Sequence, residues 1–258
     1  MKLKVVKSGS KGNCYLLTAR NGETLVIEAG VPFKTVQQAL GFDTRSVVAV
    51  LVSHEHKDHA AGVPELIERR LPVYASQGTL DAIFDGRPDL KEATSVFHAV
   101  RVGEPFPLWD FKVIAYRAQH DAAEPLYFEI YHDEMGKLLF MTDTVTPQRV
   151  AMMLANGIKT DYQHILIEAN YRDYMLADDG KLPETVKERI AANHLSDAEA
   201  LEVLGAVDLN KTLDLLLIHL SEAHSDAEDF VREFEEATGV RTRAALPGVE
   251  YDINDTPF

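Results

Sequence analysis

A short segment in the first quarter of the chain carries four side chains that can bind metal ions. An apolar run, Val47–Ser53, leads directly into His54, His56, Asp58 and His59, which follow the pattern H-x-H-x-D-H. Side chains alternate in an extended segment, so His54 and His56 point to the same side and can reach one metal ion. Once the chain turns, Asp58 and His59 can reach a second ion nearby.

Three later strand ends offer further ligands. Each of these predicted strands leads into a segment with ligand-capable side chains, and strands deliver side chains to a common sheet edge; the segments are Gln119-His120-Asp121, Thr142-Asp143-Thr144 and Ile218-His219-Leu220-Ser221. Imidazole and carboxylate ligands without a thiolate suit Zn²⁺ or Mn²⁺. Two such ions generate a bridging hydroxide near neutral pH and clamp the oxygens during in-line displacement at phosphorus. The residues therefore indicate phosphodiester hydrolysis.

The elements that must position these ligands alternate between strands and helices. Strands are expected at Leu3–Val6, Cys14–Thr18, Leu25–Glu28, Val47–Ser53, Phe111–Tyr116, Leu126–Tyr131, Leu138–Thr142, Ile165–Glu168 and Leu213–Leu220. Helices are expected at Phe33–Leu40, Val63–Arg70, Pro147–Leu154, Glu184–Ala192, Ala198–Leu204 and Asp226–Thr238. Several strands are too apolar to face water on either side. We expect an α/β fold, a four-layer αββα sandwich, formed as a single domain over residues 1–258.

Start and stop signals support the helices. Ser196 with Glu199, and Ser225 with Glu228, match the S-x-x-E capping box. The pair Thr146-Pro147 places a cap residue ahead of proline at the first helical position. We expect Gly239 to end the last helix.

Composition limits the classes of protein. Of the 258 residues, 46% are hydrophobic and 26% are charged, and no apolar run reaches the length of a membrane helix. The single cysteine, Cys14, cannot form an internal disulfide, so we expect a cytoplasmic protein without membrane contact. Residues 1–130 hold 15 basic and 16 acidic side chains, and residues 131–258 hold 11 and 25. Any polyanion must therefore bind the first half.

These ligands, in this order, resemble the metallo-β-lactamase superfamily. In that family H-x-H-x-D-H is joined by a later His, a bridging Asp and a C-terminal His. The resemblance implies one ion on His54, His56 and His120, another on Asp58, His59 and His219, and Asp143 as the bridge.

Other segments resemble the YycJ/WalJ branch of that superfamily. The matching segments are Ser8–Asn13, His120–Pro125, Thr142–Thr144, Glu168–Asn170, Asn193–Ser196 and His219–Ser221. The branch contains cytoplasmic hydrolases with 5′-to-3′ exonuclease activity on DNA, so the resemblance implies a nucleic acid substrate. The chain departs from the pattern at Glu28, where relatives have Asp, and at Val145, where they commonly have Gly. Related hydrolases are often dimers, which makes a homodimer possible.

Four residues outside the ligand set have expected roles. His194 precedes the Ser196 cap by two residues, and a histidine in a similar segment of the related tRNase Z is assigned as the general acid. His194 is therefore an expected catalytic residue. Asp58 is the other expected catalytic residue. Ser10 and Asn13, in a polar loop whose amides can face a phosphate, and Ser221 are the expected substrate-binding residues.

Two other functions compete with a DNA exonuclease. The acidic second half favours a phosphodiesterase acting on a cyclic nucleotide or another small signalling phosphodiester, because a small ligand needs no basic track. A non-catalytic metal-binding module that recognises nucleic acid or a protein is the second alternative. The complete ligand set counts against this alternative.

Overall fold

The structure is a computed structural model that describes residues 1–92 and 94–254. Its strands form two large sheets and one small sheet. The first sheet has the order β16 (Glu250–Asp252), β1 (Lys2–Lys7), β2 (Cys14–Thr18), β3 (Thr24–Ile27), β4 (Val47–Leu51), β5 (Val73–Ala75) and β6 (Phe97–Ala99). The second has the order β15 (Thr242–Ala244), β14 (Asp214–Ile218), β12 (His164–Glu168), β10 (Gly136–Met141), β9 (Leu126–His132), β8 (Phe111–Arg117) and β7 (Pro105–Leu108). The small sheet pairs β11 (Thr160–Asp161) with β13 (Val207–Asp208).

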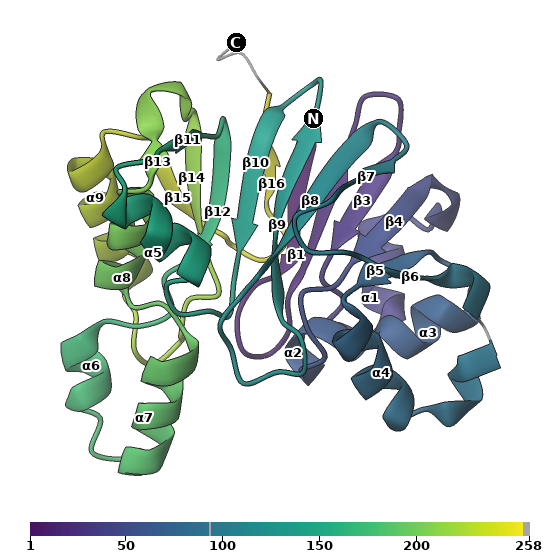
Figure 1. The fold of residues 1–258 in the computed structure, drawn as a ribbon, viewed down its shortest axis with the longest axis horizontal. Coiled ribbons are helices and arrows are strands. Elements are labelled where there is room, and N and C mark those ends of the chain that lie inside the picture. The colour runs from purple at the N-terminus through teal and green to yellow at the C-terminus, as the bar shows by residue number, and fades with distance from the viewer. Residues whose placement is uncertain (93, 255–258) are drawn as a thin grey trace.

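Helices cover the outer face of each large sheet (Figure 1). The first sheet is covered by α1 (Phe33–Ala39), α3 (Val63–Glu68) and α4 (Gln77–Asp85), and the second by α5 (Gln148–Ala155), α8 (Asp197–Leu204) and α9 (Ala227–Thr238). The helices α2 (Lys57–Ala60), α6 (Asp173–Ala177) and α7 (Glu184–Asn193) lie toward the lower end of the view. Short 3₁₀ turns occupy Thr44–Ser46, Pro88–Glu92, Thr94–Val96 and Leu209–Lys211.

Three layers of apolar side chains hold these elements together. Strand β2 shows how, because Tyr15 and Leu17 enter the core between the two sheets while Cys14 and Leu16 enter the core under α1 and α3. The alternation follows from the two-residue period of a strand, and burial on both faces explains the continuous apolar runs. A third core lies between the second sheet and its helices. The predicted αββα sandwich is confirmed.

The strand directions bring four chain segments to one end of the molecule. Strands β10, β12 and β14 are parallel to one another in the second sheet, and β3 is parallel to β4 in the first. Functional groups in α/β sheets gather beyond the carboxyl ends of such strands. The loops after β4, β10, β12 and β14 are therefore where the site is expected.

The longer predicted elements are confirmed, with ends within two residues of those observed. The short strands β5, β6, β7, β11, β13, β15 and β16 and the helices α2, α4 and α6 were not predicted from the sequence. Strand β16 pairs with β1, so the two ends of the described chain share one sheet. That pairing supports a single domain, which we retain as a proposal.

Two of the predicted helix-start signals, those of α5 and α9, differ from the structure. The Ser196 capping box is present and Gly239 ends α9 with a φ of 70°. Asp226, not Ser225, caps α9, because its carboxylate accepts from the first-turn amides while the Ser225 hydroxyl donates to Ser221. Pro147 is the cap of α5 rather than its first helical residue. Among the described residues no helix combines the length and apolar character needed to cross a membrane.

Candidate metal centre

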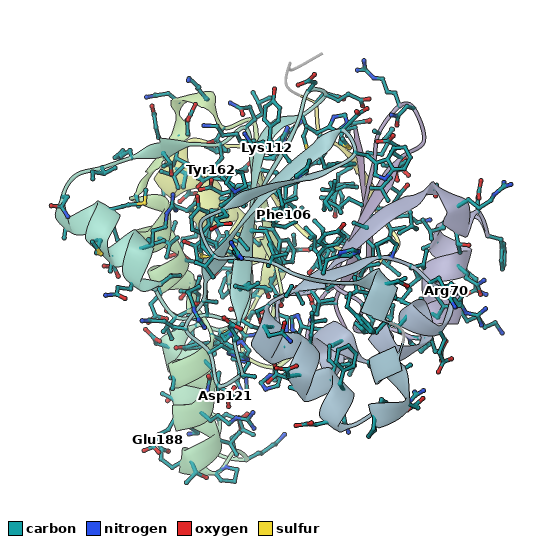
Figure 2. All side chains as sticks on the ribbon, turned by 45° about the vertical axis from the view of Figure 1, so that its right-hand side comes forward. Arg70, Phe106, Lys112, Asp121, Tyr162 and Glu188 are labelled. Carbon is teal, nitrogen blue, oxygen red and sulfur yellow. The ribbon has the colours of Figure 1, made fainter. Side chains whose placement is uncertain are left out.

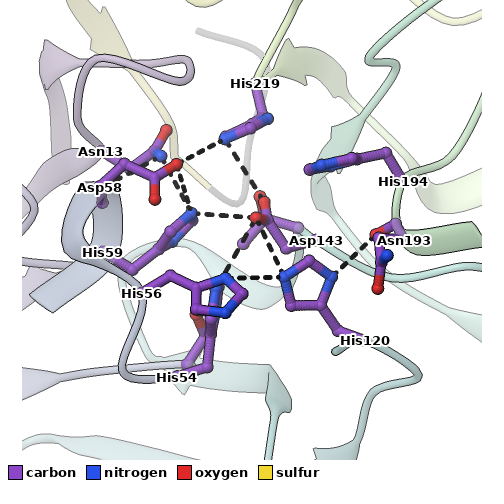
Figure 3. A network of polar contacts seen from close by, with 12 residues as sticks. Asn13, His54, His56, Asp58, His59, His120, Asp143, Asn193, His194 and His219 are labelled. Atoms are coloured by element: carbon purple, nitrogen blue, oxygen red, sulfur yellow. Dashed lines mark hydrogen bonds and ion pairs between the residues drawn. The ribbon is translucent and has the colours of Figure 1, made fainter. Parts of the chain in front are cut away.

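The predicted ligands converge at the end of the molecule where the parallel strands finish (Figure 3). His54 follows β4, His56 precedes α2, Asp58 and His59 lie in α2, and His120, Asp143 and His219 follow β8, β10 and β14. They form two groups, His54 with His56 and His120, and Asp58 with His59, Asp143 and His219. Within each group the ligand atoms all lie within 4.8 Å of one another.

Asp143 lies between the two groups. Its Oδ2 atom is 3.8 Å from Nε2 of His54 and 3.7 Å from Nε2 of His120. The same oxygen is 3.2 Å from Nε2 of His59, and Oδ1 is 3.5 Å from Nε2 of His219. One carboxylate therefore faces donors of both groups, as a bridging ligand requires.

Unusual backbone conformations place three carboxylate or imidazole groups in the site. Glu28, Asp143 and His219 follow strands β3, β10 and β14 and have φ values of 62°, 45° and 53°. Non-glycine residues in this left-handed region cost about 1–3 kcal/mol each and are enriched at functional sites. The surrounding sheets hold these sharp turns in place.

Gly30 allows the first sheet to approach α2. A Cβ atom on Gly30 would lie 1.6 Å from the carbonyl oxygen of Asp58. The amide of Ala29 donates to the carbonyl of His59 at 2.8 Å, and the amide of Asn13 donates to that of Asp58 at 2.7 Å. The main chain after β3 thus holds the ligands Asp58 and His59, and only glycine fits at this contact.

Two ligand histidines are oriented by groups far away in the sequence. Nδ1 of His120 donates to the main-chain carbonyl of Asn193 at 3.0 Å. Nδ1 of His219 is 3.2 Å from Oε1 of Glu168, and the Asn170 amide donates to the His219 carbonyl at 2.9 Å. Such partners fix the ring and leave Nε2 facing the other predicted ligands, where it could coordinate a metal ion.

Two further histidines of the set, His54 and His59, have partners that are closer to them in the sequence. Nδ1 of His54 is 2.9 Å from the Ser53 hydroxyl. Nδ1 of His59 is 3.5 Å from Oε2 of Glu28, and the Glu28 carboxylate also accepts from the Ser53 amide at 3.2 Å. Glu28 is fully buried. Glu28 is one methylene longer than the Asp of relatives, and its carboxylate still lies next to Nδ1 of His59.

The charges at the site fit a divalent cation. His54 is buried and its Nε2 has no hydrogen-bond partner; burial, followed by the nearby His59, holds its pKa well below the usual value. Burial therefore favours a neutral ring, and its Nε2 is available to a metal ion. Burial alone would lower the pKa of His219 and raise that of Asp143, yet their mutual attraction raises the former to about 10 and lowers the latter. The site therefore favours positive charge, which metal ions would supply when these rings lose their protons.

His194 and Glu168 form a second feature of the site. Nδ1 of His194 donates to Oε1 of Glu168 at 2.7 Å, and the His194 ring stacks on His219 at 5.4 Å between centroids. Burial would lower the pKa of His194, but the Glu168 carboxylate raises it above its usual value. Glu168 therefore favours the protonated form of His194.

A cleft of about 420 Å³ opens beside these groups. Ser10, Ser221 and His194 line it, as do the ligands His56 and Asp58. This placement is compatible with the predicted substrate contacts of Ser10 and Ser221.

Asn13 lies beneath the site and is buried. Its Oδ1 accepts from the Gly9 amide at 2.9 Å, and its Nδ2 is 3.1 Å from Nε2 of His59. The neighbouring Ser8 hydroxyl accepts from the main-chain amide of His219 at 2.9 Å. The polar loop thus supports ligands on both sides, and substrate contact by Asn13 stays a prediction.

The sequence analysis gave no role to Glu168, Asn193 or Arg189. Glu168 did have a signal, because it is a charged residue ending the apolar run Ile165–Ile167. Its carboxylate is fully buried between His194 and His219. Asn193 acts largely through its main chain, which no residue pattern reveals.

Comparison with known proteins gives consistent similarities. Residues 25–220 match the beta-lactamase superfamily domain. The chain is 27% identical to exodeoxyribonuclease WalJ of Streptococcus pneumoniae, covering 99% of this chain and 94% of that protein. It is 28% identical to exodeoxyribonuclease YycJ of Bacillus anthracis, covering 86% and 83%.

Solved structures share the fold. The metallo-beta-lactamase fold protein YhfI from Bacillus subtilis superposes with a TM-score of 0.71 at 17% identity, covering 97% of this chain and 98% of that one. The short form of human tRNase Z gives a TM-score of 0.65 at 16% identity, covering 98% and 99%. These likenesses concern the arrangement of sheets and helices.

Proposed function

Since this chain belongs to the beta-lactamase superfamily, we propose that it is a metal-dependent phosphodiesterase that degrades DNA as a 5′-to-3′ exonuclease. The observation that carries the proposal is the convergence of six nitrogen- and oxygen-bearing side chains around the carboxylate of Asp143. The substrate follows from the relatives named exodeoxyribonuclease, one of which aligns with 99% of the chain. These relatives favour DNA over a cyclic nucleotide and favour an enzyme over a non-catalytic module.

We assign two divalent ions, Zn²⁺ or Mn²⁺, to the site. His54, His56 and His120 would hold one, Asp58, His59 and His219 the other, and Asp143 both. When bound, such a pair lowers the pKa of water and neutralises charge on a phosphoryl group. The unpartnered Nε2 of His54 and the outer partners of His120 and His219 support this assignment.

Two side chains of the cleft would move protons. The carboxylate of Asp58 faces the cleft, and hydrogen bonds from His219 and His59 outweigh burial and keep its pKa below the usual value. An ionised Asp58 can accept a proton from the attacking water. His194, whose protonated form is favoured by Glu168, can donate one from Nε2 to the leaving oxygen.

The metal-free protein should release protons when it binds metal. His219, with a pKa of about 10, and His59, whose pKa is also raised, carry protons at pH 7.5 and must lose them to coordinate. We expect release of about two protons and an apparent affinity that rises about tenfold per pH unit for each proton released. Titration calorimetry in two buffers of different ionisation enthalpy measures this release. A binding enthalpy independent of the buffer would contradict it.

A substrate panel on one preparation tests the function. With Mn²⁺ we expect DNA to lose nucleotides from its 5′ end, DNA blocked there by phosphorothioate linkages to resist, and chelation to stop the reaction. Cyclic nucleotides and bis-p-nitrophenyl phosphate complete the panel. Intact DNA beside a consumed cyclic nucleotide would contradict the DNA substrate, and two bound metals without hydrolysis of any ester would contradict an enzyme.

The cellular location and the oligomeric state of the protein stay predictions. The buried, unpaired Cys14 is compatible with a cytoplasmic protein. A homodimer is a further proposal, and light scattering of the purified protein would test it.

A further inference from the structure

The helix α7 forms a wall of the cleft facing the candidate metal centre. The α6–α7 segment projects below the layered body of the protein (Figure 1). Along α7 only Asn193 is buried. The cleft is lined by Leu182, just before the helix, and by Val186, Arg189 and Ile190 within it. A weakly packed helix that presents side chains to an active-site cleft is well placed to contact substrate.

Arg189 is the one lysine or arginine among the described residues that line this cleft, whereas Asp58, Asp121 and Asp143 line it with carboxylates. Its Nε donates to Oδ2 of Asp121 at 2.9 Å, and the Arg189 side chain remains 67% exposed. Figure 2 shows Asp121 beside this helix, which carries Glu188 farther out. An exposed ion pair is weak, so a phosphate with more charge than Asp121 can compete for the guanidinium.

Apolar side chains flank this cation. Leu182, Val186 and Ile190 follow one another at four-residue spacing, and Val186 is 38% exposed. They belong to none of the three apolar cores. Residues four apart on a helix share a face, so a sugar or base can pack against this face while its phosphate meets Arg189.

The wall is fixed with respect to the ligands. Oδ1 of Asn193 accepts from the Asp121 amide at 2.7 Å, and the Asn193 carbonyl holds His120. At the other end of the segment, Asp179 pairs with His224 at 2.8 Å. The α7 wall is therefore tied to the loops of two ligand histidines.

The position of His194 tells which part of a strand meets this wall. His194 caps the carboxyl end of α7, five residues after Arg189, which is about 7.5 Å along a helix. In the proposed reaction water attacks phosphorus and gives a proton to Asp58, the bond from phosphorus to O3′ of the terminal nucleotide breaks, and O3′ takes the proton of His194. The terminal nucleotide leaves as a nucleoside 5′-monophosphate. It is therefore the terminal nucleotide, with its 5′-phosphate, that lies against α7.

We propose that Arg189 binds the terminal 5′-phosphate of a DNA strand while Val186 and Ile190 pack against the nucleotide that carries it. This proposal rests on the proposed function and adds the feature that selects a strand end. The cleft is near the lower limit of the volumes that hold a small ligand, about 300–1,000 Å³. It accommodates one nucleotide rather than a duplex.

Binding of single-stranded DNA to the metal-loaded protein tests the proposal. The probes are two phosphorothioate-linked oligonucleotides, labelled at the 3′ end and identical except for a 5′-phosphate or a 5′-hydroxyl, and fluorescence anisotropy gives their affinities. The unchanged protein should prefer the phosphorylated strand about 10- to 100-fold. Arg189→Gln should abolish that preference, and Arg189→Lys should keep part of it, because lysine retains the charge but not the planar fork. In Arg189→Gln the salt dependence for phosphorylated DNA should weaken by about 0.7 in log–log slope.

Arg45→Gln is the matched control. Arg45 also pairs with a carboxylate, Asp43, at 2.9 Å and lies outside the cleft, so its loss should change neither affinity. Equal affinity of the unchanged protein for both strands, or a preference that survives Arg189→Gln, would overturn the proposal. Hydrolysis of bis-p-nitrophenyl phosphate by the unchanged protein is measured separately. Because that ester has no terminal phosphate, its outcome bears on the proposed function alone.

Discussion

Replacing Asp143 by asparagine is expected to remove bound metal and hydrolytic activity together. Asp143 offers Oδ2 to His59 and His120 at 3.2 and 3.7 Å, so it is the carboxylate shared by both proposed ions. Changing a partner that merely orients a ligand costs about 10- to 100-fold in metal affinity. We expect a larger loss for a ligand shared by two ions. Metal content after dialysis and turnover of DNA measure the two effects.

Asparagine is the informative substitution because it removes the charge of Asp143 and keeps the shape of the side chain. Asp143 has a φ of 45°, a conformation that asparagine tolerates better than most residues, whereas alanine would add strain. Asp110→Asn, in the turn between β7 and β8, removes a carboxylate outside the cleft and serves as the control. Two metals held as tightly as in the unchanged protein would exclude Asp143 as the bridge.

The cluster of candidate ligands around α2 could be predicted from sequence because its spacing is local. The spacing of His54, His56, Asp58 and His59 at the end of an apolar strand indicates metal binding without any tertiary information. His120, Asp143 and His219 needed the resemblance to a known family to be assigned to particular ions. The structure shows how these segments meet. Strands β8, β10 and β14 belong to the second sheet, and α2 follows β4 of the first sheet.

The contacts that tune the ligands were not predictable in this way. The carbonyl of Asn193 meets His120 across 73 positions, and Arg189 meets Asp121 across 68. Nothing in either local pattern specifies the partner. The short strands were missed for a related reason. A three-residue strand such as β16 is too short for its alternation to be recognised in the sequence, and it is defined by its pairing with β1. The helix α4 was missed although Ser76 caps it, and Gly78 in its first turn weakens the helical signal.

His194→Ala is expected to retain both metals while slowing DNA hydrolysis by about 10²–10⁴-fold, the usual contribution of a general acid. His194 is not among the proposed ligands, and its Nδ1 is held by Glu168 at 2.7 Å, so Nε2 is left for the leaving oxygen. Stopped assays on DNA give the rate, and metal analysis gives the occupancy. Unchanged turnover would remove His194 from the mechanism.

The leaving group distinguishes general-acid catalysis from a structural role of His194. A DNA alkoxide needs a proton to depart, whereas p-nitrophenolate departs without one, so His194→Ala should slow hydrolysis of bis-p-nitrophenyl phosphate far less than hydrolysis of DNA. Glu168→Gln should lower the pKa of His194, because the carboxylate is what raises it. Since the acid must be protonated, the fall in rate with rising pH should then begin at a lower pH than in the unchanged protein. Equal losses on both substrates, with an unshifted pH profile in Glu168→Gln, would mean that His194 only supports the neighbouring His219 ring, on which it stacks.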